Sequence, residues 1–305
     1  MTQNTQLLLE QLQDPNCDPL RRAQIGIMLA INGDPRRGVG LRPDNLPDID
    51  WLEVPVPETN TFAQTASLLR RIMPGTRRHI ENNFYISRYL TTYAQFDAFL
   101  QATGQRVQPG KFQESFTSYT LDFVEYPGNY PRNYVNWSYA SDFAEWLNEV
   151  MPSDGRPTGA PGSDWVIRLP TRVEWQLAAN NGNPFREYPW GRWKPNHCNS
   201  AELGIDGPLA VGLFPHGQSI CGALDMAGNL SEWTSEYIPD DVYSEFYEEI
   251  GDPSDNLVPI LVLGGSFQHN KNVCKIDLGR YFSPYRSSID SVPHIGFRCV
   301  IGRRL

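Results

Sequence analysis

The stretch that decides the fold begins with Gly264-Gly265-Ser266-Phe267 and ends with Gly296-Phe297-Arg298-Cys299. Both ends combine glycine with apolar residues, a composition typical of tightly packed backbone. The residues between them show neither the alternation of a strand nor the period of a helix. We therefore interpret residues 268–294 as a surface segment that a rigid scaffold presents.

Composition bounds the class of protein. The chain has 305 residues, is 40% hydrophobic, and contains 25 glycines and 25 prolines, which favours a loop-rich α+β domain over a helical bundle. Its formal net charge of −9 disfavours a nucleic-acid ligand, because such ligands attract basic surfaces. No window approaches the ~20 apolar residues of a membrane span, so no membrane partner is expected.

The cysteines and the N-terminus indicate the compartment. Five widely spaced cysteines with no C-x-x-C pair argue against a disulfide framework or a structural zinc site. The N-terminal residues lack a basic segment followed by an apolar run, so they do not read as a secretory signal. A cytoplasmic protein is the resulting expectation.

Residues 1–50 are expected to form a short helical extension and linker. Leu7, Leu8 and Leu12 form an apolar stripe on a first helix. Asp18-Pro19 begins a second helix that Asn32-Gly33 ends. The apolar residues of this second helix are Leu20, Ile27, Leu29 and Ile31. Because two short helices cannot bury their apolar faces alone, we expect the extension to dock on a neighbour, and it could attach the chain to a larger assembly.

Residues 51–305 are expected to form one domain of short strands and few helices. Residues 83–89 alternate like a half-buried strand. Apolar spacing predicts helices over 91–102 and 138–150, and a capping box from Thr171 to Glu174 predicts a helix that ends near Asn180. After Gly182 the pattern indicates turns and short strands, with much irregular loop.

Several short motifs occur in an order that resembles one family. They are Arg168-Leu169-Pro170-Thr171 with Glu174-Trp175, Tyr188-Pro189-Trp190-Gly191, Asp225-Met226-Ala227-Gly228-Asn229 with Glu232-Trp233, Gly264-Gly265-Ser266, and Gly296-Phe297-Arg298. Together they resemble the formylglycine-generating enzyme, or sulfatase-modifying factor, domain. The resemblance implies a variant C-type lectin fold over residues 51–305. It does not choose a function, because the family includes oxidases, sulfoxide synthases, non-catalytic members and variable proteins of diversity-generating retroelements.

The oxidase members imply a copper site that this chain does not reproduce. Those enzymes hold Cu(I) with two cysteines, three and eight residues after the serine of Gly-Gly-Ser. The matching positions here are His269 and Cys274, so one thiolate is missing and we expect no copper. The sulfoxide synthases take iron-binding histidines from an N-terminal helical domain, and residues 1–50 contain no histidine; iron is therefore not expected either.

Calcium is the cofactor that the resemblance implies. The matching ligands would be the carbonyl oxygens of Asp225, Gly228 and Leu230 with the side chain of Glu232, and a second position would involve Asn199 and Glu202. Oxygen ligands at a tight glycine turn suit this hard cation. The alternative is that Glu232 serves as a hydrogen-bond anchor without a metal.

The segment between the glycine motifs is the candidate ligand surface. Aromatic residues beside adaptable polar ones are typical of recognition surfaces. The candidate residues are Gln268, His269, Asn270, Asn272, Asp277, Tyr281, Phe282, Tyr285, Arg286, Asp290 and His294. We expect a non-catalytic recognition protein with a protein ligand, and in diversified members of the family this stretch is the variable region. Two alternatives remain open: an ordinary irregular loop, and a metal-dependent oxidase with a rearranged site around His269 and Cys274.

Overall fold

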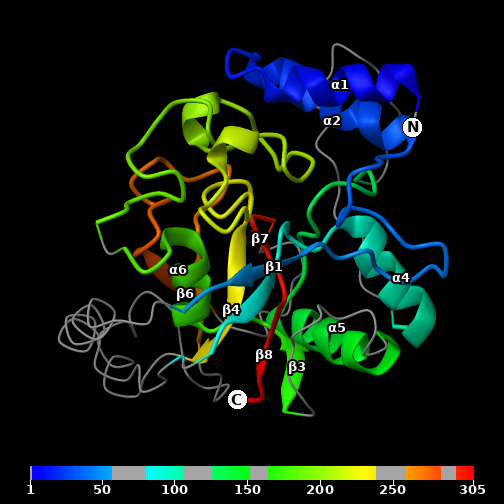
Figure 1. The fold of residues 1–305 in the computed structure, drawn as a ribbon, viewed down its shortest axis with the longest axis vertical. Helices are drawn as coiled ribbons and strands as arrows, with labels where there is room; N and C mark the ends of the chain where they lie inside the picture. Colours follow the sequence, from blue (N-terminus) through cyan, green and yellow to red (C-terminus); the bar gives the residue numbers. More distant parts are fainter. Residues whose placement is uncertain are drawn as a thin grey trace.

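Two small sheets form the centre of the molecule (Figure 1). The computed structural model describes residues 2–56, 80, 82–105, 126–151, 164–183, 185–237, 259–282 and 293–305. The first sheet has the strand order β1 (Trp51–Val54), β2 (Phe84–Ser87), β8 (Val300–Arg303), β3 (Trp165–Arg168). The second has the order β6 (Gly279–Phe282), β5 (Ile260–Leu263), β4 (Ser231–Tyr237), β7 (Ile295–Gly296). All pairs are antiparallel except β4 with β7, so the predicted α+β class is confirmed.

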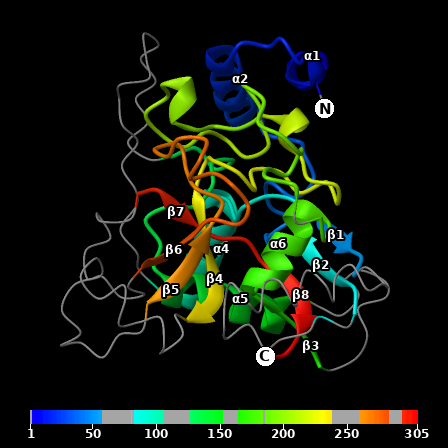
Figure 2. The same cartoon turned by 90° about the vertical axis from the view of Figure 1, so that its left-hand side faces the viewer.

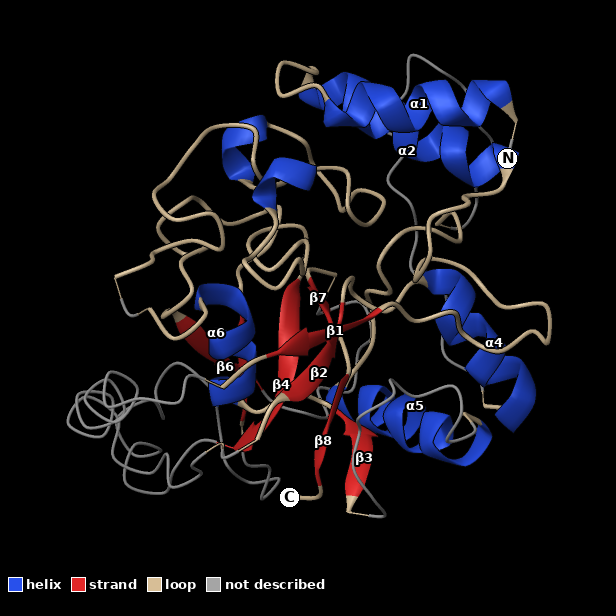
Figure 3. Cartoon of the chain, in the orientation of Figure 1, coloured by secondary structure: helices blue, strands red, loops and turns tan. Residues whose placement is uncertain are grey.

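The predicted helices form, and local signals fix their ends. The described helices are α1 (Gln3–Gln13), α2 (Pro19–Asn32), α4 (Tyr93–Thr103), α5 (Trp137–Val150) and α6 (Arg172–Asn180). The side chains of Thr171 and Glu174 form the expected capping box at the start of α6. Gly104 ends α4 in the left-handed conformation, with φ of 69°. Loops and turns make up most of the chain between the helix pair and the sheets (Figure 3).

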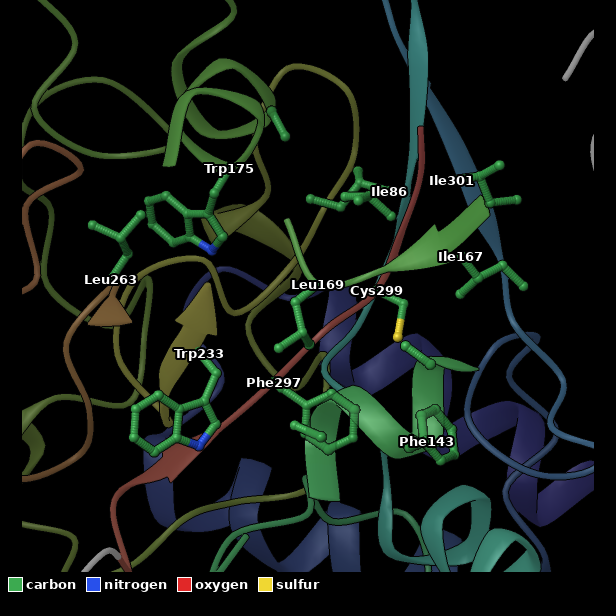
Figure 4. Packing of buried hydrophobic residues seen from close by; sticks show 14 of the residues in the cluster. Ile86, Phe143, Ile167, Leu169, Trp175, Trp233, Leu263, Phe297, Cys299 and Ile301 are labelled. Carbon is green, nitrogen blue, oxygen red and sulfur yellow. The ribbon is translucent and has the colours of Figure 1, made fainter. Parts of the chain in front are cut away.

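The main core lies between the two sheets and is rich in aromatic rings (Figure 4). Trp175 from α6, Trp233 from β4 and Phe297 after β7 are almost completely buried. Cys299 lies in the same cluster with Ala144 and Ala179. Burial raises the pKa of Cys299 to about 12, so this thiol stays protonated and acts as a small apolar side chain.

The N-terminal helix pair packs on a second, smaller core at the end of the molecule away from the C-terminus (Figures 1 and 2). Leu8, Leu12, Ile25 and Leu29 bury their side chains against residues 205–214. Gly26 allows close approach, because a Cβ there would lie 2.9 Å from atoms of both Ala210 and Leu213. The extension therefore docks on its own chain.

Two details of burial differ from the sequence prediction. Leu7, Leu20 and Ile31 were expected on the buried faces but are 52%, 58% and 57% exposed. The buried face of α2 is set by what it packs on, and that surface is nearly two hundred residues away in sequence. Strand β2 is buried at all four positions rather than on alternate ones, because it is an inner strand of its sheet.

The predicted linker lies against the domain. The carboxylate of Asp34 accepts from Arg36 at 2.6 Å and from the Asn129 amide at 2.9 Å, and Arg36 donates to the Val211 carbonyl. The side chain of Gln95 donates to the carbonyls of residues 38 and 48. The boundary at residue 50 stays a prediction. Within the described helices, none is long and apolar enough to cross a membrane.

We predict that Arg22→Met destabilises the protein by about 3 kcal/mol, mainly by releasing α1. Arg22 is 1% exposed, and its guanidinium donates to the carbonyls of Leu12, Asp14, Cys17 and Leu213 at 2.6–3.2 Å. A thioether cannot donate to these carbonyls, which would stay buried without partners. Hydrogen exchange of the α1 amides and thermal unfolding measure the effect.

The matched control is Arg21→Met, one residue earlier in the same helix. The Arg21 side chain donates to the Gln11 and Gln24 amide oxygens and is only partly buried. This variant should change stability by less than about 0.5 kcal/mol. Equal losses in both variants would show that Arg22 has no special role.

Candidate functional site

Two glycine-containing motifs hold the ends of the candidate surface; we refer to residues 264–266 and 296–298 as the glycine frame. Gly264 and Gly265 adopt φ of 88° and 67°, where a side chain is strained. A Cβ at Gly265 would lie 2.8 Å from the Cys274 sulfur and 3.0 Å from its Cα. The second glycine is therefore required both by its conformation and by the close approach of residue 274.

A buried ion pair anchors the other half of the frame. Arg298 and Glu232 are both 0% exposed, and the Arg298 Nε and Nη2 atoms donate to the two Glu232 oxygens at 2.6 and 2.8 Å. The indole N–H of Trp175 donates to the same carboxylate at 2.8 Å. Glu232 is thus a hydrogen-bond anchor whose two oxygens are already engaged by the protein.

A pocket of about 180 Å³ opens beside this frame. It lies where β4 begins, along β5 and β6, and under the loop after Ser266. Its lining residues are Ser231, Val262, Gly265, His269, Val273, Leu278, Gly279 and Arg280. Two valines and a leucine supply apolar side chains, and Arg280 and His269 supply a guanidinium and an imidazole. The pocket therefore has an apolar part and a polar part, as small-molecule sites do.

His269 is held as a neutral hydrogen-bond acceptor. The backbone N–H of Ser266 donates to its Nδ1 at 3.0 Å, and Arg280 Nη1 lies 3.2 Å from its Nε2. Burial, followed by the charge of Arg280 and the neighbouring His294, lowers the pKa of His269 to about 4. At neutral pH this imidazole carries no charge.

His294 completes the polar end of the pocket. Its ring lies 5.7 Å from that of His269 between centroids, at 84°. Burial and Arg280 lower the pKa of His294 as well. Sequence spacing gave no sign of this pair, because the two histidines are brought together only when β7 pairs with β4. Arg280 was also missing from the predicted residues; its position follows from the pairing of β6 with β5, which sets Arg280 opposite Val262.

Cys274 lies beneath the pocket rather than in it. The residue is 0% exposed and packs with Tyr188 and Ala227. Its thiol faces the carbonyl oxygens of Ser266 and His269 at 3.9 and 3.7 Å. Burial raises the pKa of Cys274 to about 12, so the thiolate that would bind a metal or react is not formed at neutral pH.

The backbone of residues 269–276 is fixed by segments that lie far away in sequence. The amide of Ala201 donates to the His269 carbonyl at 3.0 Å, and the Lys271 amide donates to Glu202 at 2.7 Å. The hydroxyl of Tyr188 donates to the Lys271 carbonyl, and the Ile276 amide donates to the carbonyl of residue 187. The surface loop thus has a defined path that does not depend on its outward-facing side chains.

The predicted ligand residues divide into three groups. The side chains of Gln268, Asn270, Asn272 and Asp277 are exposed on this loop, and His269 and His294 are partly buried at the pocket. Tyr281 and Phe282 belong to β6. Tyr285, Arg286 and Asp290 lie outside the described residues.

The predicted calcium ligands differ in whether their oxygen atoms are already engaged by the protein. Glu232 does not fit, because Arg298 and Trp175 occupy its oxygens. The oxygens of Glu202 accept from Ser200 and from the Lys271 amide. In contrast, Asn199 is 1% exposed and its Oδ1 atom has no hydrogen-bond partner among the described residues. The described part of the chain also contains no group of three His, Cys, Asp or Glu side chains arranged to hold a metal ion.

Asp225 is the remaining side chain near these positions. One of its oxygens accepts from the Gly212 amide at 2.6 Å. Burial raises the pKa of Asp225 to about 6, which shows a carboxylate that is incompletely compensated by the protein. Calcium binding by Asp225, Gly228, Leu230, Asn199 and Glu202 stays a prediction.

Comparison with known proteins agrees with this geometry. A formylglycine-generating enzyme of Thermomonospora curvata is 26% identical over 276 residues, covering 71% of this chain and 81% of the relative. The inactive C-alpha-formylglycine-generating enzyme 2 of Mus musculus is 35% identical over 121 residues, covering 36% of this chain and 33% of the relative. The solved structure of CarF is similar in fold, with a TM-score of 0.54, 20% identity, and coverage of 84% of this chain and 98% of CarF.

The family model for the sulfatase-modifying factor enzyme 1-like domain matches residues 54–303. This range contains both sheets apart from the first residues of β1, the whole glycine frame and the pocket, and it leaves the N-terminal helix pair outside. The chain therefore belongs to the sulfatase-modifying factor enzyme 1-like domain family.

Proposed function

We propose that this protein is a non-catalytic recognition protein that binds its ligand through the pocket and the exposed side chains of residues 268–294. The observation that carries the proposal is the state of the two residues at the positions of the oxidase cysteines. His269 is engaged by Ser266 and Arg280, and Cys274 is a buried, protonated thiol. Neither is poised for metal or redox chemistry.

The fixed backbone of the loop supports a display role. Contacts from Ala201, Glu202 and Tyr188 hold its path, while Gln268 and Asn272 point outward. In such an arrangement the backbone path does not depend on which side chains are exposed. It suits a protein ligand, and in its narrower form the proposal includes the variable proteins of diversity-generating retroelements.

One observation favours the alternative of a rearranged oxidase site. The neighbouring rings of His269 and His294 could in principle offer two nitrogen ligands. A metal there would have to displace Arg280, whose Nη1 atom lies 3.2 Å from the Nε2 atom of His269. Two imidazoles beside a fixed cation make a poor site for a metal cation.

We predict that titration with Cu(I) or Fe(II) under anaerobic conditions gives no tight stoichiometric binding to the native protein. The expected competition curve against a chromogenic chelator is the same for the wild type and for Cys274→Ser. Labelling with iodoacetamide at pH 8 is a control for access, because the partly exposed Cys221 should react well before Cys274. One equivalent of metal that Cys274→Ser or His269→Ala removes would support the oxidase and contradict our proposal.

A second prediction concerns tolerance of the surface to substitution. Replacing Gln268, Asn272 and Asp277 together with alanine should change the free energy of unfolding by less than about 0.5 kcal/mol per site, because their side chains are exposed. Gly265→Ala should cost about 2 kcal/mol or more, since it adds a methyl against Cys274 at positive φ. Denaturant unfolding compares the two. A large loss in the triple variant would show that these side chains hold the fold and are not displayed for a ligand.

We also propose a structural calcium ion on the Asn199 side of the predicted set. The support is the unpartnered Asn199 Oδ1 and the incompletely compensated Asp225 carboxylate, since calcium takes oxygen ligands. The melting temperature should rise by a few degrees in millimolar CaCl₂ relative to EGTA, and Asn199→Ala should remove the rise. An identical melting temperature in both solutions would eliminate the ion.

A further inference from the structure

The pocket beside the glycine frame contains an arginine, Arg280, that has no acidic partner among the described residues. None of the ion pairs between these residues includes Arg280, and the described lining of the pocket contains neither Asp nor Glu. Its Nη1 atom lies 3.2 Å from the Nε2 atom of His269. The Nδ1 atom of this neutral ring accepts from the Ser266 amide, so the ring proton is on Nε2, which does not accept from Arg280. A guanidinium has five N–H donors, so most of its donating capacity faces the pocket and the solvent.

The neighbouring histidines lie within the field of this positive charge. His269 and His294 both have a lowered pKa, and Arg280 contributes to both shifts after burial. The described residues of the pocket lining carry one cationic side chain and no carboxylate. Among these residues the polar end of the pocket is therefore electropositive, although the chain as a whole carries a net charge of −9.

The rest of the lining is apolar and the space is small. Val262, Val273 and Leu278 supply its apolar side chains, and strand pairing sets Val262 beside Arg280. The volume of about 180 Å³ is below the ~300–1,000 Å³ of pockets that hold drug-sized ligands. A group of a few carbon atoms with one anionic end matches both the size and the distribution of charge.

We propose that this pocket binds a carboxylate that carries a short branched apolar chain. The planar guanidinium of Arg280 receives the carboxylate through paired hydrogen bonds, and the apolar chain lies against Val262, Val273 and Leu278. This inference rests on the proposed recognition function and specifies its ligand. The same chemistry has two sources, a free branched acid or the C-terminal leucine or valine of a protein, and the experiment separates them.

The test uses the full chain and ligand-observed saturation-transfer NMR with matched probes. Isovalerate is compared with isovaleramide, which has the same shape and no charge. The peptide acetyl-Gly-Gly-Leu with a free C-terminus is compared with its C-terminal amide. Each acid should bind at least about tenfold more tightly than its amide, because charge-assisted hydrogen bonds to the carboxylate are lost in the amide. Tighter binding of the peptide acid than of isovalerate identifies a protein C-terminus as the source, and the reverse order identifies a free acid.

Substitutions at one residue connect binding to the pocket. Arg280 is exposed on the edge strand β6, so Arg280→Gln should fold normally and weaken binding of the acids about tenfold or more. Arg280→Lys should give an intermediate affinity, because an ammonium keeps the charge without the paired geometry. Arg303→Gln, at the exposed end of β8, is the matched control and should stay within about twofold of the wild type.

Three outcomes would overturn the inference: equal binding of acid and amide, unchanged affinity in Arg280→Gln, or no binding of either acid. None of them decides the proposed recognition function. That function fails on a different result, a metal ion bound stoichiometrically through Cys274 or His269. The two failures are therefore distinguishable in the same protein preparation.

Discussion

The rest of the structure depends on the buried pair of Glu232 and Arg298, both without solvent exposure. Removing two charges from water is expensive, and it is offset only when every donor and acceptor is satisfied. Arg298 meets this condition by donating to Glu232 in β4, to the carbonyls of residues 87 and 88 at the end of β2, and to that of Leu224. Trp175 of α6 donates to the same carboxylate. One side chain thus fixes the relative positions of both sheets, a helix and the turn at residue 224, because displacement of any of them would leave a buried charge unpaired.

The same constraint explains how the loop after Ser266 can expose its side chains while its backbone stays fixed. The chain on both sides of residues 268–294 is held by groups that the exposed side chains do not touch: the ion pair at one end and the positive-φ glycines at the other. Within the loop, the amides and carbonyls of residues 269–276 are bound by residues 187–202. Cys274 contributes to the fold by packing directly against Gly265. This packing role needs no thiolate.

The sequence predicted those features that are encoded within a few residues. The capping box of Thr171 and Glu174, the left-handed end of α4 at Gly104, and the family motifs all correspond to what forms. It did not predict which face of α2 is buried, because Ile25 rather than Ile31 meets residues 205–214. The site shows the same limit. His269 and Cys274 were predicted from their spacing after Ser266. Arg280 reaches the site because β6 pairs with β5, and His294 reaches it because β7 pairs with β4. No local sequence pattern specifies either pairing.

The arginines of the chain show why Arg280 stands apart. Arg22 is satisfied by four carbonyls, Arg36 by Asp34 and a carbonyl, and Arg298 by Glu232 and three carbonyls. Each of these guanidinium groups joins segments far apart in sequence, so its partners are part of the fold. Arg280 lies on an edge strand beside the imidazole of His269, and its charge contributes to the lowered pKa of both His269 and His294. No ion pair between described residues joins this guanidinium to another segment. Because it lies at a small pocket with apolar lining, its N–H groups are available to a partner that arrives from solution.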